Sequence, residues 1–227
     1  MNRGIVVSLV GACLLSVSSP VLAAGADKQP ALFEIEQNGK TGFIDAGGRV
    51  VVAPQFDSVR GRFQEGFIRV EKDGVWGYMN PAGKVMALRY EGVDEFEEGR
   101  GRVKGKKGMG FVDHAFTELI PPVYEDAGDF HEGVARVKKD GKWGFIDLNG
   151  KVIVPPQFKD ADDFAEGLAR VKVEKRWGYI NKQGKVVVEP RFRDADSFKG
   201  GLARVKTDDD RPAYINKKGV IVWQQTK

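Results

Sequence analysis

Histidine and carboxylate side chains are the groups in this sequence that could carry acid–base or metal chemistry. The chain has two histidines, His114 and His131, and neither has the partners of a Ser-His-Asp triad or the spacing of a metal-ligand set. Acidic clusters occur at 160–163 and 208–210, but a calcium site needs six or more oxygen ligands and usually a tight glycine turn. We interpret the histidines as surface residues and the clusters as solvated loops. We therefore predict no catalytic residue, no metal site and no cofactor.

Arginine recurs at one register of a repeated pattern, at Arg69, Arg102, Arg136, Arg170 and Arg204. If the repeats stack, these guanidinium groups form a ladder. Each could pair with a carboxylate of its own or the next repeat, or lie on a tryptophan ring, because a planar guanidinium binds carboxylates in a fork and stacks on aromatic faces. The other interpretation is a basic stripe that binds an anionic glycan or an acidic peptide. We favour the structural role and keep the stripe as the candidate ligand site.

Tryptophan recurs in the same way, at Trp76, Trp143 and Trp177, each directly before a glycine. A row of aromatic rings could serve as a platform for carbohydrate or peptide. It could equally be the packed core of the stack, since large aromatic side chains dominate core energetics. A glycine within a strand also often marks a close backbone approach. We favour the core and keep the row as a second candidate surface.

The repeat that carries both rows has a period of about 34 residues, which is the signature of a stacked repeat architecture. Copies start near residues 32, 67, 100, 134, 168 and 202. One glycine series marks the register at Gly42, Gly77, Gly110, Gly144 and Gly178, with Ala213 in the sixth copy. A second series is Gly66, Gly99, Gly133, Gly167 and Gly201, and an aromatic series is Phe63, Phe96, Phe130, Phe164 and Phe198.

Each copy has the pattern of three short strands. Residues 168–172 alternate in polarity, as a half-buried strand does. In the copy before, Asp140-Gly141 predicts a type I′ hairpin turn, because such pairs supply the positive φ that this turn requires. The strand at 143–147 follows, and a type I turn that ends at Gly150 leads to a third strand.

Proline is expected to end the third strand, at 151–154, because it cannot donate a hydrogen bond to a sheet. The prolines in question are Pro155, Pro156 and Pro190. The remainder of a copy, such as 157–167, has the composition of an acidic loop, with or without one irregular strand. Phe158 and Phe164 would hold this loop to the core.

The fold class that these patterns predict is all-β, since no segment has sustained helical periodicity and turn signals recur roughly every 8 to 12 residues. A single meander cannot bury its apolar face alone, whereas stacked copies can. We expect an open or gently superhelical array of about six β-meander repeats. A closed propeller-like ring is the alternative.

Three strings then point to a family: KWGFID at Lys142 to Asp147, RWGYIN at Arg176 to Asn181 and VWGYMN at Val75 to Asn80. With the PPQF and EGLARVK elements they make the chain resemble the WG-repeat family, also called KWG repeats, over roughly residues 32 to 223. The resemblance implies a β-rich bacterial repeat module, often exported, with no common activity, substrate or cofactor. Four residues depart from the pattern. The tryptophan position holds Thr41, Met109 and Pro212, and Phe116 replaces a turn glycine.

The N-terminus predicts export. Residues 1–23 have the features of a signal peptide, with Arg3, an apolar run from Ile5 to about Leu15, and small residues before a cleavage site after Ala23. Residues 24–31 would be a short linker, and 32–227 the repeat domain. Cys13, the only cysteine, ends a lipobox-like LVGAC, so a lipid anchor at Cys13 is the alternative. A mature chain that lacks Cys13 can have neither a disulfide nor a thiolate zinc site.

Taken together, the sequence predicts a non-catalytic binding or scaffold module of the periplasm or the extracellular space. Its partner would be a protein or a cell-surface polysaccharide. The formal net charge is only +4 with both signs interleaved, so charge gives no argument for nucleic acid or membrane. We expect a monomer without a membrane span after cleavage. The alternative is a carboxylate-dependent hydrolase of envelope polysaccharide, which needs two carboxylates at a defined separation.

Overall fold

The computed structural model describes residues 31–226, and this part of the chain forms β-strands and no helix. The predicted signal peptide, nearly all of the predicted linker, and Cys13 lie outside the described residues. The strands form six antiparallel sheets, each made of strands that are neighbours in the sequence. The all-β prediction is confirmed.

The sheets follow one another in chain order. The first has three strands: β1 (Phe33–Gln37), β2 (Lys40–Ile44) and β3 (Val50–Phe56). The second is β4 (Ser58–Gln64), β5 (Phe67–Lys72), β6 (Val75–Met79) and β7 (Val85–Tyr90). The third is β8 (Gly92–Glu97), β9 (Arg100–Gly105), β10 (Gly108–Val112) and β11 (Glu118–Tyr124).

The last three sheets share one pattern, in which a two-residue strand precedes three longer ones. The fourth is β12 (Asp126–Ala127), β13 (Val134–Lys139), β14 (Lys142–Asp147) and β15 (Val152–Phe158). The fifth is β16 (Asp160–Ala161), β17 (Leu168–Val173), β18 (Arg176–Asn181) and β19 (Val186–Phe192). The sixth is β20 (Asp194–Ala195), β21 (Leu202–Lys206), β22 (Pro212–Asn216) and β23 (Ile221–Gln224).

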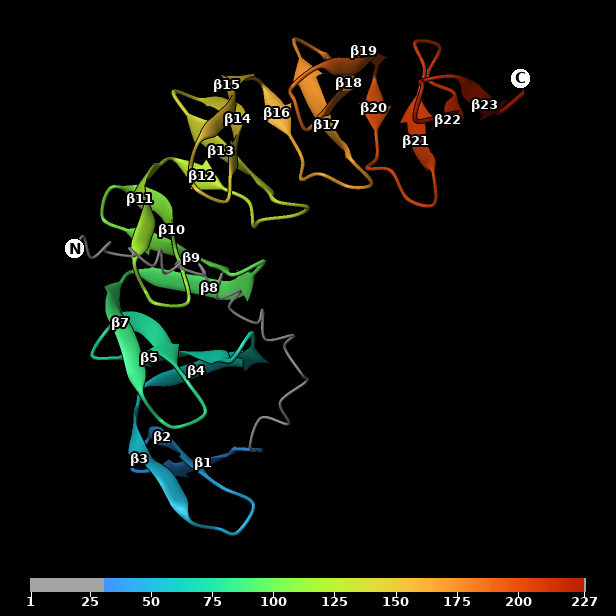
Figure 1. The fold of residues 1–227 in the computed structure, drawn as a ribbon. Coiled ribbons are helices and arrows are strands. Elements are labelled where there is room, and N and C mark those ends of the chain that lie inside the picture. Colours follow the sequence, from blue (N-terminus) through green and yellow to red (C-terminus); the bar gives the residue numbers. More distant parts are fainter. Residues whose placement is uncertain (1–30, 227) are drawn as a thin grey trace, which may run out of the picture.

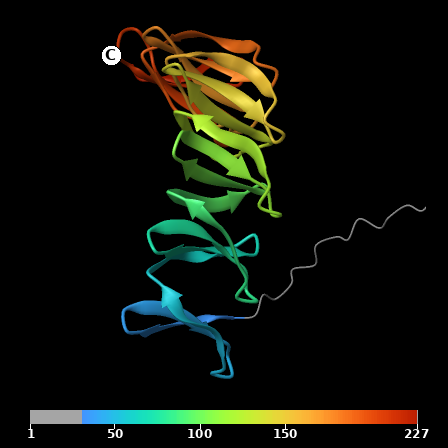
Figure 2. The same cartoon turned by 90° about the vertical axis from the view of Figure 1, so that its left-hand side faces the viewer.

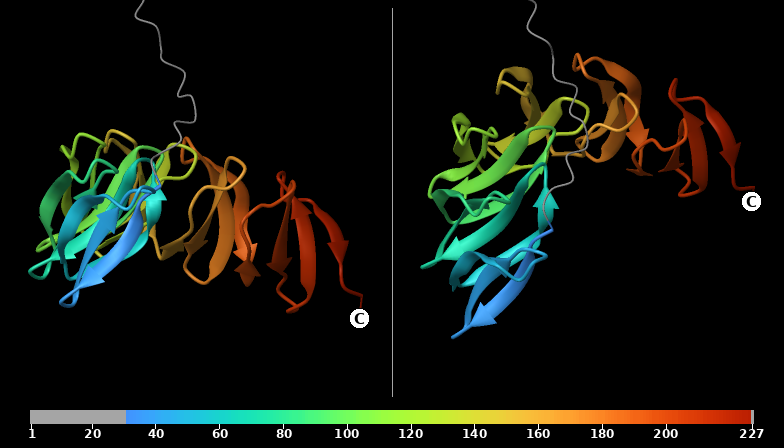
Figure 3. Two further views of the ribbon diagram at one scale, coloured as in Figure 1. Left: turned by 90° about the horizontal axis from the view of Figure 1, so that it is seen from below. Right: turned by 60° about the horizontal axis from the view of Figure 1, so that its bottom comes forward.

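The sheets stack into an open array with a bend in the middle (Figure 1). Seen from the side, the first sheets lie one above the other like rungs (Figure 2). Seen from below, the red sheet β20–β23 lies well away from the blue sheet β1–β3 (Figure 3). The two ends therefore do not close into a ring, and the open array predicted from the sequence is confirmed.

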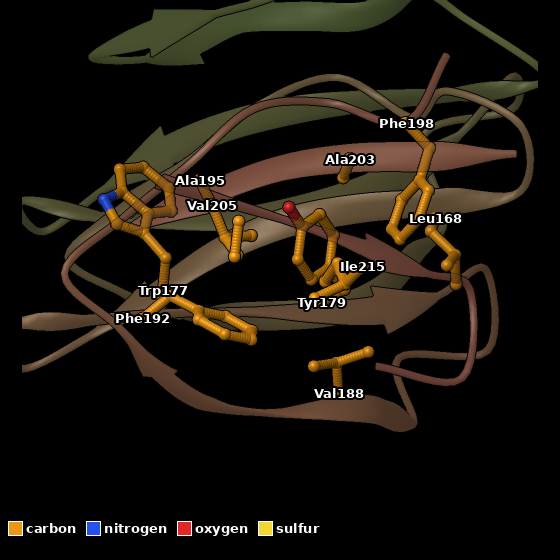
Figure 4. Close-up of a cluster of buried hydrophobic side chains, with 11 residues drawn as sticks. Leu168, Trp177, Tyr179, Val188, Phe192, Ala195, Phe198, Ala203, Val205 and Ile215 are labelled. Atoms are coloured by element: carbon orange, nitrogen blue, oxygen red, sulfur yellow. The ribbon is translucent and has the colours of Figure 1, made fainter. Parts of the chain in front are cut away.

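The core consists of apolar clusters between successive sheets rather than one central core. The cluster between the last two sheets combines Trp177, Tyr179 and Val188 of one sheet with Val205 and Ile215 of the next (Figure 4). Each of the four interior sheets thus buries one face against its predecessor and the other against its successor, as in repeat proteins where each unit contacts only its neighbours.

The turns have the predicted chemistry. Asp140 and Gly141 have φ angles of 51° and 70° and join β13 to β14, and two positive φ values are the mark of a type I′ turn. The N–H of Gly150 donates to the carbonyl oxygen of Asp147 at 2.9 Å, and Gly150 itself has a φ of 78°. These local predictions are confirmed because they depend only on residues within the turn.

Proline does not end the third strand, so that prediction was wrong. Strand β15 continues through Pro155 and Pro156, and β19 continues through Pro190. Both are edge strands of their sheets. An edge strand has a neighbour on one side only, so a proline there need not deprive another strand of a hydrogen-bond donor. The register of β15 on β14 shifts between Trp143 and Phe145 and again between Phe145 and Ile146, so the proline-containing segment forms a bulge over Gly144.

The acidic segment after each third strand contains the short strand that opens the next sheet. Residues 157–167 include β16, which pairs with β17, and Phe158 and Phe164 are buried as predicted. Each of the last three sheets consequently begins ahead of the repeat start that the sequence suggested.

The departure of the third repeat at Phe116 has a packing reason. Phe116 has a φ of 62°, the conformation that glycine adopts at the equivalent turn positions. Its ring lies 5.1 Å from that of Phe67 and 5.6 Å from that of Tyr78. Such aromatic contacts are worth about 0.5–1.5 kcal/mol beyond the area they bury, which offsets the strain of a non-glycine residue at positive φ.

Candidate functional site

Arginines of the predicted ladder link one sheet to the next. Arg136 on β13 donates from Nη1 to the carbonyl oxygen of Ala161 at 2.7 Å. Arg170 on β17 donates in the same way to Ala195, and the third such pair is Arg102 and Ala127. In each pair the acceptor lies 25 residues further along the chain, within the short first strand of the next sheet.

Carboxylates of that next sheet complete the contact. Asp162 accepts from Arg136 at 2.9 Å and from Arg170 at 2.5 Å, so one carboxylate joins arginines of two neighbouring sheets. Asp94 has the same place in the third sheet, where Arg102 lies at 2.8 Å. Guanidinium and carboxylate groups therefore alternate along one side of the array, and we call this set of side chains the arginine–carboxylate row.

The row changes in the fourth sheet, where Gly128 stands in place of an aspartate. A Cβ atom on Gly128 would lie 2.8 Å from Cγ and Nε of Arg136 and 2.5 Å from Oδ1 of Asp163. Arg136 instead fills this space, and its Nε lies 3.2 Å from Oδ1 of Asp163. Among the described residues, neither of these two buried atoms has a partner with good hydrogen-bond geometry.

Two carboxylates of the row resist ionisation. Burial raises the pKa of Asp163, although the nearby guanidinium of Arg136 opposes the shift. Burial also raises the pKa of Asp129, against the charge of Arg102. His131 lies at the surface with its Nε2 3.9 Å from Asp163. Asp163 and His131 border an open depression of about 350 Å³, which Arg136, Asp162, Phe164, Ala165 and Ser197 also line.

The two ends of the predicted ladder differ from its middle. Arg69 binds Oε1 of Glu95 at 2.9 Å and so also reaches the next sheet. Arg204 on β21 is exposed, and within residues 31–226 its side chain makes no ion pair or hydrogen bond. The sequence places all five arginines at one register, but only the four that have a following sheet are bound between sheets.

Tryptophan rings lie next to this row. Trp76 and Trp177 are buried, and Trp143 is half-buried. The guanidinium of Arg170 lies 4.6 Å from the centre of the Trp177 ring, and that of Arg136 lies 5.2 Å from the Trp143 ring.

Cations other than the ladder arginines also approach the rings. Arg60 covers Trp76 at 4.6 Å. Lys138 and Lys172, on the strands paired with the tryptophan strands, approach Trp143 and Trp177 at 5.8 Å and 5.2 Å. Positive charge therefore lies over each of the three tryptophan rings.

A second ladder, of glutamates, was missed in the sequence analysis. The carboxylate of Glu132 accepts from the N–H of Gly167 at 3.0 Å, and that of Glu166 accepts from Gly201 at 2.9 Å. Glu98 binds Gly133 in the same way, at 2.7 Å. The sequence contains a pattern that could have predicted this ladder, because a glutamate stands directly before each of the first four glycines of the second series.

Within residues 31–226 no group of three or more histidine, cysteine, aspartate or glutamate side chains could hold a metal ion. That range also contains no helix of the length and apolarity that a bilayer crossing requires.

Fold and site together define a tandem-repeat protein, in which small β-meanders stack through apolar clusters and a row of arginine–carboxylate contacts. The chain belongs to the family of WG containing repeats, whose model matches residues 42–76, 76–108, 109–143, 143–177 and 177–209. A comparison with curated protein sequences gives no match.

Solved structures resemble the chain in fold alone. A eukaryotic initiation factor superposes with a TM-score of 0.51 and 12% identity, over 85% of this chain and 62% of that one. BamB from Moraxella catarrhalis gives a TM-score of 0.43 and 13% identity, over 87% and 70% of the two chains. Hsv2p from Kluyveromyces lactis gives 0.45 and 8%, over 82% and 71%.

Proposed function

We propose that the protein is a non-catalytic, exported binding or scaffold module of the bacterial envelope, whose partner is a protein or a cell-surface polysaccharide. The observation that carries this proposal is the repetition of one surface. Partly exposed arginines, carboxylates and cation-bordered tryptophans recur from sheet to sheet along an open array. Solenoid proteins use extended surfaces of this kind for binding.

Positive charge beside the tryptophan rings favours an anionic partner over a neutral one. Lys138 and Lys172 are half-buried against tryptophan rings, and within the described residues neither ammonium group is in an ion pair. An anionic group on a partner could approach both of them without displacing a hydrogen bond between sheets. The arginines are less available, because their guanidinium groups already bind the next sheet.

The test is a glycan array and a pull-down from envelope extract with the purified full chain. A Lys138→Ala/Lys172→Ala variant should lose binding, and the loss should be greatest at low salt because screening weakens exposed charges. Lys139→Ala/Lys175→Ala removes the same charge from exposed positions near hairpin tips and should bind normally. Equal binding by both variants would rule out this surface.

A second function, hydrolysis of an envelope polysaccharide, is favoured by one observation. Asp129 and Asp163 have raised pKa values through burial, and perturbed carboxyl groups are a feature of glycosidase sites. Release of sugar from envelope polysaccharide by the full chain, lost in both Asp129→Asn and Asp163→Asn, would establish this activity. Absence of release leaves the binding module as the function to pursue.

A further inference from the structure

The outer face of the sixth sheet exposes side chains whose register equivalents in the fourth and fifth sheets are buried. The three residues concerned are 38%, 40% and 53% exposed: Leu202, Tyr214 and Trp223. Their register equivalents in the fifth sheet are only 7%, 0% and 3% exposed: Leu168, Tyr179 and Val188. The difference arises because the sixth sheet covers the fifth (Figure 4).

Two polar groups on this outer face are also arranged for a following sheet. Tyr179 donates its hydroxyl to the carbonyl oxygen of Asp196 at 2.7 Å, and Arg170 donates to that of Ala195. Tyr214 and Arg204 occupy the same registers one sheet later, and both are exposed. The face therefore has the chemistry of an interior contact without the sheet that would complete it.

The first sheet presents the complementary face at the opposite end of the array. In the interior contact of Figure 4, Ala203, Val205 and Ile215 form the covering side. Strands β1 and β2 place Phe33, Ile35 and Ile44 at these three registers. Phe33 is 51% exposed, and the other two are partly exposed. Every equivalent residue in the five later sheets is buried.

We propose that a second copy of the chain occupies the outer face of the sixth sheet. Strands β1 and β2 of that copy would pack Phe33, Ile35 and Ile44 on Leu202, Tyr214 and Trp223, as one sheet packs on the next inside the array. This contact joins two different surfaces, so it is heterologous and extends into a ring or a filament. It goes beyond the proposed function and replaces the monomer that the sequence suggested.

The association is reversible, because the contact lacks one element of the interior arrangement. In the described residues the first sheet has three strands and no counterpart of β20 and the following Asp196, whose carbonyls accept from Arg170 and Tyr179. The apolar residues must therefore supply the affinity. An aspartate substituted for one of these apolar residues would be buried in the contact without a partner. Burying an unpaired charge is costly, so the substitution should prevent association.

Sedimentation velocity of the full chain over a wide concentration range tests the proposal. The wild type should associate as its concentration rises, and Trp223→Asp and Phe33→Asp should each remain monomeric. Val173→Asp is the matched control: Val173 is also exposed, at 42%, but lies on β17 of the fifth sheet and belongs to neither terminal face. It should associate like the wild type. Circular dichroism would establish that all variants keep the β-sheet spectrum.

Mixing the two monomeric variants identifies the surfaces. The Phe33→Asp chain keeps its C-terminal face and the Trp223→Asp chain keeps its N-terminal face, so a mixture should form a dimer with one copy of each and nothing larger. A wild type that stays monomeric at every concentration overturns the proposal. Dissociation by Val173→Asp as well, or a mixture that does not dimerise, also overturns it.

Discussion

Arg136 of the fourth sheet donates a hydrogen bond of 2.7 Å to the carbonyl oxygen of Ala161 in the fifth. The acceptor belongs to a two-residue strand, β16. Such a strand has few contacts of its own, and the arginine of the preceding sheet holds it in place. Arg102, Arg136 and Arg170 thus connect side chains of one sheet to the backbone of the next.

Replacing a ladder arginine that has a following sheet should destabilise the array. Arg170→Ala leaves Asp162 without one of its two arginines and the carbonyl of Ala195 without its donor. The expected loss is about 1–3 kcal/mol in the free energy of unfolding. Arg170→Lys should recover only part of it, because lysine lacks the planar fork. Unfolding in urea, followed by circular dichroism, measures both.

Arg204 is the matched control, since it has the same register but no bound partner among the described residues. Arg204→Ala should change the free energy of unfolding by no more than about 0.5 kcal/mol, as usual for surface positions. Equal destabilisation by the Arg170 and Arg204 variants would show that contacts with the next sheet are not the cause.

The glycine after each tryptophan should be irreplaceable wherever the facing strand is bulged. A Cβ on Gly144 would lie 2.6 Å from both the nitrogen of Pro156 and the carbonyl oxygen of Val154, and these backbone atoms cannot move aside as a side chain can. Gly144→Ala should therefore lower the free energy of unfolding by about 1–3 kcal/mol or more.

The sixth sheet provides the control, since it has Ala213 at this register and β23 pairs there without the bulge. Ala213→Gly should cost only about 0.5–1 kcal/mol, and similar thermal midpoints for the two variants would contradict this explanation.

Asp163 should make the protein less stable as the pH rises. Its pKa is raised from 3.8 by burial, so the native state binds this proton more tightly than the unfolded state. Stability from this group is consequently greatest in acid and is lost from about pH 3.8 upward to the raised value. In urea titrations between pH 4 and pH 7, Asp163→Asn should gain stability relative to the wild type as the pH increases. A difference that is constant with pH would contradict the prediction.

Glu166 should have the opposite dependence. The ammonium of Lys217 and the N–H of Gly201 lower its pKa below 4.5, so the native state favours the carboxylate. Its contribution is present above the ordinary glutamate value and is lost as the pH falls below about 4.5. Glu166→Gln should be less stable than the wild type at pH 7, and the two should converge in acid. A deficit that persists at pH 3 would mean that the charge of Glu166 is not what stabilises the contact.

Export predicts a defined N-terminus. If residues 1–23 are removed by a signal peptidase, protein isolated from the envelope should begin at Ala24. Intact-mass measurement decides between this outcome, a retained N-terminal segment, and a chain lipid-modified at Cys13. Only the first agrees with the predicted cleavage.

Local patterns in the sequence were sufficient for the class of fold, the repeat and the turns. Asp140-Gly141 and the turn glycine at Gly150 specify backbone angles within a few residues, and alternation at 168–172 specifies a strand with two unlike faces. These features need no knowledge of distant residues, because φ preferences and the two-residue period of a strand are properties of the local chain.

Tertiary structure alone decided which residues meet between repeats. Arg170 and Arg204 have the same local sequence, yet one is bound between two sheets and the other is exposed. Pro155 lies within a strand because β15 is at an edge, which no local pattern specifies. The Glu132–Gly167 contact depends on how far one sheet is offset from the next. Stacking geometry sets these contacts, since each arises between units about 34 residues apart that the chain brings together only on folding.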